Sequence, residues 1–317
     1  MCEMMFKIKQ YWQAICFSFV VILCNFAHAS TQAQMNQTVT PKRIVVLEFS
    51  LLDNLNQLSL KPVGVGTSGF LYEGADPEYL EPIIAKTPSV GAREAPNLEA
   101  IASLKPDLII GDIDFNQAIQ AQLEKIAPTI LLKGIFGLPE QQIENLKIIA
   151  QKTNTISQVP SIVANYQKQY TVAQKLAKKG GSSKVLIGFP TANNSFNALA
   201  HNSITSQILD QFGKHNMISE STSSQLYELS VEGLLRKNPD QIVILLTGND
   251  RSAFVNFQKN PLWQQLTAVK NHKVYFADRN IWGKSHGLKA LTLMYQEGIQ
   301  TGFLGNTPTK EIIAIAN

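Results

Sequence analysis

A short unit of capped helix, proline stop and buried strand occurs twice in this chain of 317 residues and constrains the fold more than any other feature. In the first copy Asn97 is a good N-cap, and Pro106 ends the helix by disfavouring the α region at the residue before it. In the second copy Ser230 and Pro239 hold the same positions. An apolar run of the kind buried in parallel sheets follows each proline. Alternating strands and helices predict a mostly parallel α/β sheet in each half of the chain.

One long helical segment separates the two halves. Residues 159–179 carry apolar side chains at helical spacing, and Lys178-Lys179-Gly180-Gly181 places basic residues and then glycine at the end. No strand pattern interrupts this segment, so one helix is expected to join two α/β lobes. Near the start of the first lobe, Ser50 is expected to cap a helix over 51–58. The predicted boundaries are 30–157 for the N-terminal lobe, 158–180 for the connecting helix and 181–317 for the C-terminal lobe.

The first 29 residues predict a signal peptide. Lys7 and Lys9 precede an apolar run over 14–26, and an A-x-A cleavage site ends at Ala29. The apolar run is too short for a comfortable membrane span, and an uncleaved N-terminal anchor is the alternative. We expect cleavage after Ala29 and export to the periplasm. The mature chain then has no disulfide and no thiolate, because the cysteines all lie in the leader, at Cys2, Cys16 and Cys24.

Composition and motifs argue against several classes of protein. A net charge of +4 without a Lys/Arg-rich run gives no support for nucleic-acid binding. Residues 64–69 form a G-x-G-x-x-G, but a loop is expected to follow, so no helix N-terminus is available for a pyrophosphate. The histidines of the mature chain lack metal-ligand spacing, and no G-x-S-x-G or Walker sequence occurs. We therefore expect neither an enzyme nor a metal site or cofactor held directly by the protein.

Loops at the ends of the predicted strands offer a ligand cleft, because their aromatic and cationic side chains suit a planar or anionic small ligand. Glu99 and Glu232 form a separate pair, since each lies in the first turn of its capped helix, seven residues before the proline stop. An ordinary role in the helix dipole is the alternative for both glutamates. The ligand candidates are Tyr72, Arg93, Asp112, Asp114 and Phe115 in the first lobe and Asn194, Arg251, Trp282, Lys284 and His286 in the second.

Several segments, in the right order, carry a resemblance to a known family. They are RIVVLEFSLLDNL at 43–55, VGAREAPNLEAIASLKPDLIIGD at 90–112, IAPTILL at 126–132, SVEGLL at 230–235, NPLWQQLTAVKNHKVYFAD at 260–278 and the turn at 280–282. Together they make the chain, from Arg43 to about Gly305, resemble the periplasmic substrate-binding proteins of ABC importers for iron–siderophore complexes. The ferric dicitrate-binding type is the most similar.

The resemblance implies two α/β lobes on a helical backbone, with the ligand in the cleft between them. It implies a monomeric solute-binding protein that captures a ferric siderophore in the periplasm and delivers it to the inner-membrane permease. The chelator, and not the protein, would hold the iron. On the same resemblance Arg93 contacts anionic groups around the iron and Phe115 lies near an aromatic position of the cleft. Glu99 and Glu232 would dock onto arginines of the permease.

Two departures from the ferric dicitrate type bear on the ligand. A basic loop after the K-P-D strand is replaced by Asp112 and Asp114, and an arginine-bearing turn reads Gly283-Lys284-Ser285-His286. The cleft is expected to have lost positive charge, which favours a less anionic or mixed-charge siderophore, or a cationic ligand group opposite the two acids. Two other readings stay open. One is a haem or cobalamin binder on the same fold, with Tyr72 or His286 as axial ligand, and the other is an exported α/β hydrolase.

Overall fold

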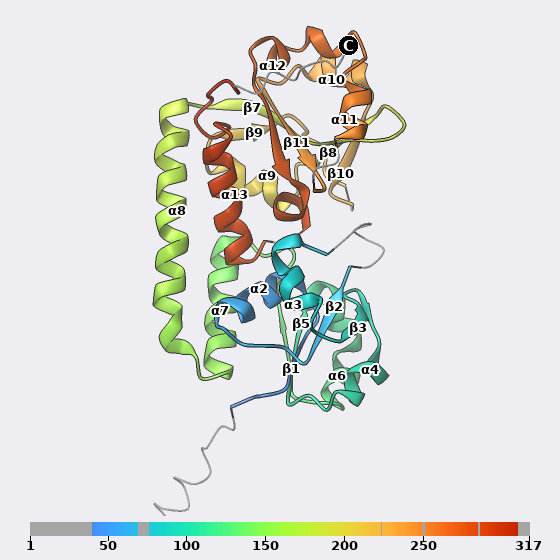
Figure 1. Cartoon of the computed structure of the whole chain (residues 1–317), viewed down its shortest axis with the longest axis vertical. Coiled ribbons are helices and arrows are strands. Elements are labelled where there is room, and N and C mark those ends of the chain that lie inside the picture. The colour runs from blue at the N-terminus through green and yellow to red at the C-terminus, as the bar shows by residue number, and fades with distance from the viewer. Residues whose placement is uncertain (1–39, 69–75, 223, 249–250, 285, 310–317) are drawn as a thin grey trace, which may run out of the picture. The chain divides into compact units, whose positions relative to one another are not determined.

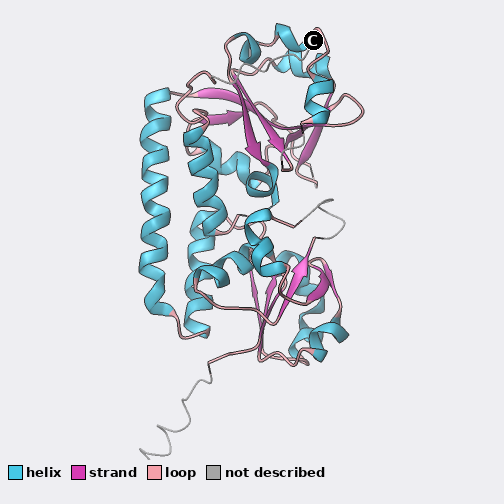
Figure 2. Ribbon diagram, viewed as in Figure 1, coloured by secondary structure: helices cyan, strands magenta, loops and turns pink. Residues whose placement is uncertain are grey.

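The computed structural model describes residues 40–68, 76–222, 224–248, 251–284 and 286–309, and the predicted signal peptide and Tyr72 lie outside these ranges. The chain from Pro41 onward forms two α/β lobes, each with a central sheet and helices packed around it (Figures 1 and 2). One long helix runs beside both lobes (Figure 1). The predicted fold class is thereby confirmed, while the exact domain boundaries stay predictions.

The apolar runs of the first half form a sheet in the order β4-β3-β2-β1-β5-β6. Neighbouring strands are parallel except β3 and β4, which are antiparallel. β1 lies between β2 and β5 and is buried along its whole length, as expected for a strand covered on both faces. The strands are β1 (Ile44–Val46), β2 (Gly64–Thr67), β3 (Ser89–Ala92), β4 (Ala95–Pro96), β5 (Leu108–Asp112) and β6 (Thr129–Leu132).

The helix starts of this lobe show one predicted cap and one unexpected cap. Asn97 Oδ1 accepts a hydrogen bond from the backbone N–H of Ala100 at 3.0 Å, which confirms the predicted cap of α4. The cap predicted at Ser50 is wrong, because α2 already begins at Phe49 and Glu48 caps it. Glu48 Oε2 accepts from the N–H of Ser50 at 2.6 Å, and the longer side chain reaches the helix start from an extended residue. The helices are α2 (Phe49–Gln57), α3 (Glu81–Ile84), α4 (Leu98–Ser103), α5 (Ile113–Asn116), α6 (Gln120–Glu124) and α7 (Pro139–Lys152).

The second lobe repeats the pattern with a mixed sheet in the order β10-β8-β7-β11-β12, with β9 paired to β7. Ser230 Oγ accepts from the N–H of Gly233 at 3.1 Å, so the second predicted cap is also confirmed. The strands are β7 (Ser183–Pro190), β8 (Phe196–Leu199), β9 (Lys214–Asn216), β10 (Leu226–Leu229), β11 (Gln241–Leu246) and β12 (Val274–Asp278). The helices are α9 (Ile204–Asp210), α10 (Val231–Lys237), α11 (Ser252–Phe257), α12 (Thr267–Lys270), the π-helical turn η5 (Asn280–Lys284) and α13 (Leu288–Gln300).

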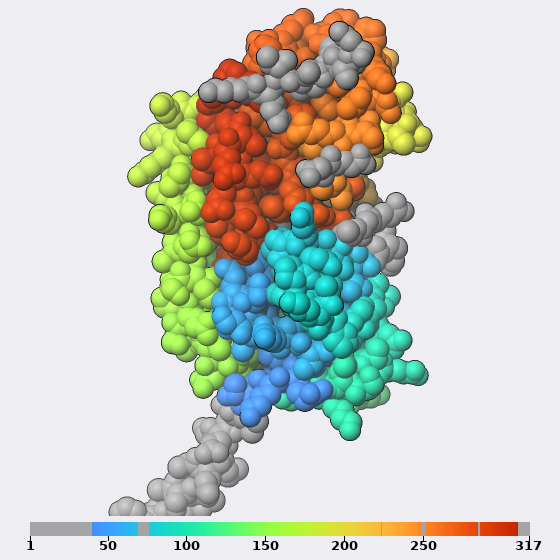
Figure 3. Space-filling view, viewed as in Figure 1, coloured from blue at the N-terminus to red at the C-terminus, as the bar shows by residue number. Residues whose placement is uncertain are grey.

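Two long helices tie the lobes together. The predicted connecting helix is confirmed as α8 (Val159–Gly180), and it packs along α13 (Figure 1). The hydroxyl groups of Tyr166 in α8 and Tyr295 in α13 lie 3.2 Å apart. Apolar residues of both lobes, for example Ile110 and Ile187, belong to one continuous core around these helices. In the space-filling view the red surface of α13 meets the blue surface of the first lobe (Figure 3). Separating the lobes would therefore expose core surface to water.

A side chain of the first lobe caps a helix of the second. Asp53 in α2 accepts hydrogen bonds through Oδ2 from the backbone N–H groups of Lys289 at 3.0 Å and Ala290 at 3.1 Å, at the N-terminus of α13. The residue before α13 is Gly287, and a Cβ there would collide with the Asp53 carboxylate. Glycine is therefore needed for this close approach. Burial raises the pKa of Asp53 to about 7, although the two backbone N–H groups favour the charged form.

The pH dependence of stability tests this cap. Between about pH 4 and 7 the folded protein keeps a proton on Asp53 that the unfolded chain has lost, so this group makes stability fall as pH rises. Buried His286 acts in the opposite sense, because burial lowers its pKa to about 4. Asp53→Asn should therefore make the unfolding free energy rise more steeply with pH in this window, by up to about 1.4 kcal/mol per pH unit.

Denaturant unfolding at a series of pH values measures this slope. His286→Gln is the matched variant of opposite sign and should make stability fall more steeply with pH between about 4 and 6.5. If the unfolding free energy of Asp53→Asn changes with pH in parallel with that of the wild type, the raised pKa of Asp53 is contradicted.

Candidate ligand-binding site

Charged side chains lie at the ends of strands in both lobes. Arg93 directly follows β3 in the first lobe, and Lys284 ends the π-helical turn after β12 in the second. Burial is the main cause that lowers the pKa of Lys284, and the charges of Arg279 and Arg93 lower it further. The carboxylates of Asp278 and Asp76 act in the opposite direction and raise it.

Arg93 is held in place on several sides. Its Nη1 donates to Glu48 Oε1 at 2.8 Å, and neither side chain is exposed to solvent. The guanidinium lies over the Phe49 ring at 3.9 Å from its centroid and 5.9 Å from that of Phe115. Asn116 Nδ2 donates to the Arg93 carbonyl oxygen at 3.0 Å, which anchors the backbone. The guanidinium is thereby sandwiched by aromatic rings and oriented by one carboxylate.

Asp112 serves as a local cap in this structure. Its Oδ1 accepts from the backbone N–H groups of Asp114 at 2.8 Å and Phe115 at 3.3 Å, at the start of α5. Its Oδ2 accepts from Gly134 at 2.8 Å and Ile135 at 2.9 Å. Burial, followed by the charge of Glu48, raises the pKa of Asp112 to about 6. A contact between Asp112 and a ligand stays a prediction, as it does for the exposed Asp114.

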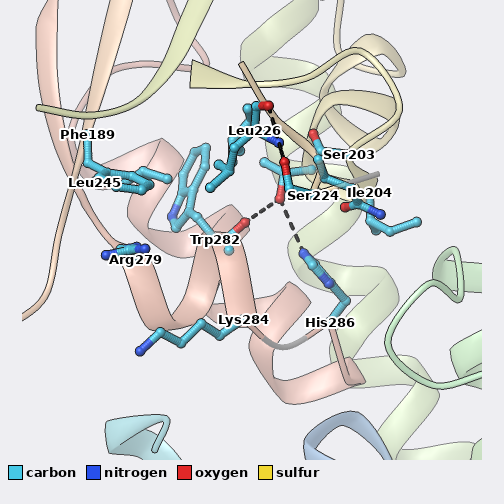
Figure 4. A pocket seen from close by; sticks show the side chains of 14 residues that line it. Phe189, Ser203, Ile204, Ser224, Leu226, Leu245, Arg279, Trp282, Lys284 and His286 are labelled. Atoms are coloured by element: carbon cyan, nitrogen blue, oxygen red, sulfur yellow. Dashed lines mark hydrogen bonds between the residues drawn. The ribbon is translucent and has the colours of Figure 1, made fainter. Parts of the chain in front are cut away.

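A pocket of about 60 Å³ lies in the second lobe beside η5 (Figure 4). Trp282 forms one wall and is only 1% exposed. Its Nε1 donates to Glu297 Oε2 at 2.6 Å, and its ring packs edge-on against Phe303. The Thr205 hydroxyl donates to the Trp282 carbonyl oxygen and lies 3.2 Å from His286 Nε2. The remaining lining residues are Phe189, Leu199, Ser203, Ile204, Ser224, Gln225, Leu226, Leu245, Arg279, Gly283 and Lys284.

Two cations border this pocket. Arg279, the first residue after β12, stacks on the Phe189 ring at 3.7 Å from its centroid. Lys284 is 1% exposed, and Figure 4 shows its side chain extending away from Trp282. Arg279 was not among the predicted ligand residues, although it lies in a loop at the end of a strand, as the selected residues do.

Three predicted ligand residues therefore line the pocket, namely Trp282, Lys284 and His286. Arg93, Phe115 and Asp112 belong to the group at the strand ends of the first lobe. Asn194 is exposed in the turn between β7 and β8, with φ +58°. Arg251 lies over the Phe276 ring at 4.4 Å and borders a separate depression with Tyr275 and Gln300. Neither Asn194 nor Arg251 lines the pocket beside Trp282.

The described part of the chain offers neither a cluster of metal ligands nor a membrane-spanning helix. There, no group of three or more His, Cys, Asp or Glu side chains is placed to hold a metal ion. His286 is buried, its pKa is lowered to about 4 mainly by burial, and its Nε2 lies beside the Thr205 hydroxyl, so the imidazole is neutral at pH 7. In the same residues no helix is both long and apolar enough to span a bilayer.

Two α/β lobes joined by a long helix, with a pocket lined by aromatic and cationic side chains, are the architecture of a solute-binding protein of the kind that serves ABC importers. A profile described as "Periplasmic binding protein" matches residues 44–281. The chain belongs to this family.

Relatives and solved structures agree with the assignment. The chain is 33% identical over 255 residues to the Fe(3+)-citrate-binding protein YfmC of Bacillus subtilis, covering 79% of this chain and 78% of the relative. It is 27% identical to the Fe(3+) dicitrate-binding periplasmic protein FecB of Escherichia coli, covering 86% and 90%. The structure of the petrobactin-binding protein YclQ of Bacillus subtilis matches with a TM-score of 0.68 at 25% identity, covering 81% and 90%.

The protein is thus a substrate-binding component of an ABC importer for ferric siderophores and related iron complexes. It acts outside the cytoplasm and is a binding protein, not an enzyme. The predicted function class is confirmed.

The cap role of Asp112 can be tested by substitution. Asp112→Asn places an amide NH₂ where one oxygen accepts two backbone N–H groups, so it should destabilise the fold by about 1–3 kcal/mol. Asp114→Asn removes a neighbouring exposed charge and should change stability by less than about 0.5 kcal/mol. Urea unfolding at pH 7.5 measures both effects, and equal stability of the two variants would refute the cap role.

Proposed function

We propose that this protein binds a ferric complex of a carboxylate-rich chelator, of the ferric citrate type, in the periplasm. The observation that carries the proposal is the pair of cations, Arg279 and Lys284, that borders the pocket beside Trp282. Guanidinium and ammonium groups are the usual partners of carboxylates in protein sites. The two relatives named above, whose names describe ferric citrate binding, support the same ligand class.

The size of the pocket fits this ligand class. A volume of about 60 Å³ is about that of two water molecules, so it suits one small arm of a chelate and not the whole complex. Apolar side chains such as Leu226 and Leu245 line one part, while Arg279 and Lys284 border another. Burial disfavours the charged form of Lys284. A carboxylate arm of the ligand near these cations would stabilise the ammonium and offset this cost. The iron would stay in the shell of the chelator.

The orientation of the acids also favours an anionic ligand. The expectation of a cleft depleted in positive charge relied on Asp112 and Asp114. Asp112 directs both carboxylate oxygens to backbone N–H groups, and Asp114 is exposed on α5. Arg279 adds a cation that the sequence reading did not count. The balance of charge at the junction therefore supports a polycarboxylate complex more than the sequence indicated.

Binding measurements on charge variants test this proposal. Ferric citrate should quench tryptophan fluorescence of the wild type more strongly at low concentration than a neutral ferric trihydroxamate. Arg279→Gln and Lys284→Met should each weaken ferric citrate binding by about 10-fold to 100-fold, since each removes a charged hydrogen-bond donor. Arg251→Gln is the matched control, because this arginine also stacks on a phenylalanine but borders another depression. Tighter binding of the neutral chelate would overturn the proposed ligand class.

We further propose that Glu99 and Glu232 dock the loaded protein onto the permease. Both side chains are exposed in the first turn of capped helices, α4 and α10. Hydrogen bonds from its own backbone N–H and from the Ser230 hydroxyl lower the pKa of Glu232, which keeps it charged. One exposed carboxylate on each lobe gives a partner two anchors whose separation depends on the arrangement of the lobes.

Charge reversal separates docking from ligand capture. Glu99→Lys and Glu232→Lys should leave ferric citrate affinity within about 2-fold of the wild type, because both residues are exposed on helices outside the pocket. Uptake of radioactive iron by cells that depend on this protein should fall by about 10-fold or more. Glu144→Lys in α7, another exposed glutamate, is the control and should leave uptake unchanged. Normal uptake by the double variant would exclude the docking role.

A further inference from the structure

The ion pair between Glu48 and Arg93 is a charge pair with no solvent exposure on either side chain. Glu48 is fixed independently of the pair, since its Oε2 accepts from the N–H and the hydroxyl of Ser50 and from the N–H of Leu51. The carboxylate therefore stays at the end of β1 whether or not Arg93 is bound to it. Any ligand anion that binds the Arg93 guanidinium must therefore compete with the Glu48 carboxylate.

Other carboxylates surround Glu48. A Cβ on Gly134 would lie 2.7 Å from Asp112 Oδ2 and 2.8 Å from Glu48 Oε2, so the two carboxylates meet across this glycine. Glu48 and Asp112 repel each other, and Glu48 also acts on Asp53. The titratable and charged groups around the cluster are Arg93 after β3, Asp112 on β5, Asp53 in α2, Lys289 in α13, and His286 and Lys284 before α13.

We propose that Glu48 is a specificity-determining residue that acts as an internal substitute for a ligand carboxylate on Arg93, so that an anionic chelate must displace it and binds less tightly than it would without this competitor. This inference rests on the proposed function, because it assumes that Arg93 turns to an anionic iron complex. A neutral chelate gains too little from the guanidinium to replace a buried, charge-assisted hydrogen bond. An anionic chelate supplies an equivalent bond and can also reach Arg279 and Lys284.

Displacement of Glu48 from Arg93 by a ligand carboxylate should change the number of protons bound by the protein. When Arg93 leaves Glu48, the Glu48 and Asp112 carboxylates lie on either side of Gly134 without the guanidinium that neutralises Glu48. Burial and the charge of Glu48 already raise the pKa of Asp112 to about 6, so loss of the guanidinium favours uptake of a proton from solvent by the Asp112 carboxylate. Capture of an anionic chelate should therefore be accompanied by proton uptake, whereas binding of a neutral chelate that leaves the ion pair intact should not.

The first experiment measures the affinity of Glu48→Gln for ferric chelates of graded charge, from ferric citrate to a neutral ferric trihydroxamate. The amide oxygen of Gln can still cap α2, while the negative charge is lost. Affinity for the most anionic chelate should rise by roughly 10-fold relative to that for the neutral one. Glu144→Gln in α7 is the matched control, because it makes the same chemical change at an exposed glutamate that does not pair with Arg93, and its selectivity should equal that of the wild type. Unchanged or reduced selectivity of Glu48→Gln would overturn the inference.

The second experiment uses the unaltered protein, so it does not depend on the folding of a variant. Calorimetric titration at pH 7 in two buffers of different ionisation enthalpy gives the number of protons taken up with ferric citrate. An uptake of about half a proton or more is expected, and none would overturn the inference. If the wild type binds another ferric chelate but not ferric citrate, the proposed ligand is rejected. The role of Glu48 is then decided by the affinities for the chelates of graded charge. Binding of no ferric chelate at all would reject both.

Discussion

The hydrogen bonds from the start of α13 to Asp53 are the interaction on which the arrangement of the two lobes depends. Every helix start leaves backbone N–H groups without partners inside the helix, and Gly287 before α13 has no side chain to supply one. The first lobe provides the acceptor instead. Because the cap comes from the other half of the chain, α13 is complete only when the lobes are in place. The continuous core around α8 and α13 reinforces this coupling.

The same use of carboxylates recurs at the strand ends of the first lobe. Glu48 caps α2, and Asp112 caps α5 and also binds the loop after β6. Each acid is buried, and each is paired to backbone N–H groups that offset part of the cost of burial. The acids are thereby engaged inside the lobe, whereas Arg279 and Lys284 border the pocket of the second lobe. The net charge that the pocket presents to a ligand consequently differs from the sum of the charged residues in the loop sequences.

Local signals in the sequence were sufficient for most of the fold. The caps at Asn97 and Ser230, the proline stops and the helix over 159–179 all depend on neighbouring residues, and the structure has each of them. Asp53 is different, since its partners lie 236 and 237 residues further along the chain and no local pattern identifies them. The cap of α2 was assigned to Ser50 because serine is the common cap, while the longer Glu48 side chain reaches the same N–H groups from the strand.

Site residues were harder to predict because residue type does not reveal direction. Trp282 was expected as an open aromatic wall, but its indole is almost fully buried by Phe303 and hydrogen-bonded to Glu297. A wall fixed in this way adapts little to the outline of a ligand. Selectivity in such a pocket then has to come from charge, supplied by cations whose positions are set by aromatic stacking, as for Arg279 on Phe189 and Arg93 on Phe49. Under the proposed function, a site of this kind would recognise the anionic surface of an iron complex without touching the metal.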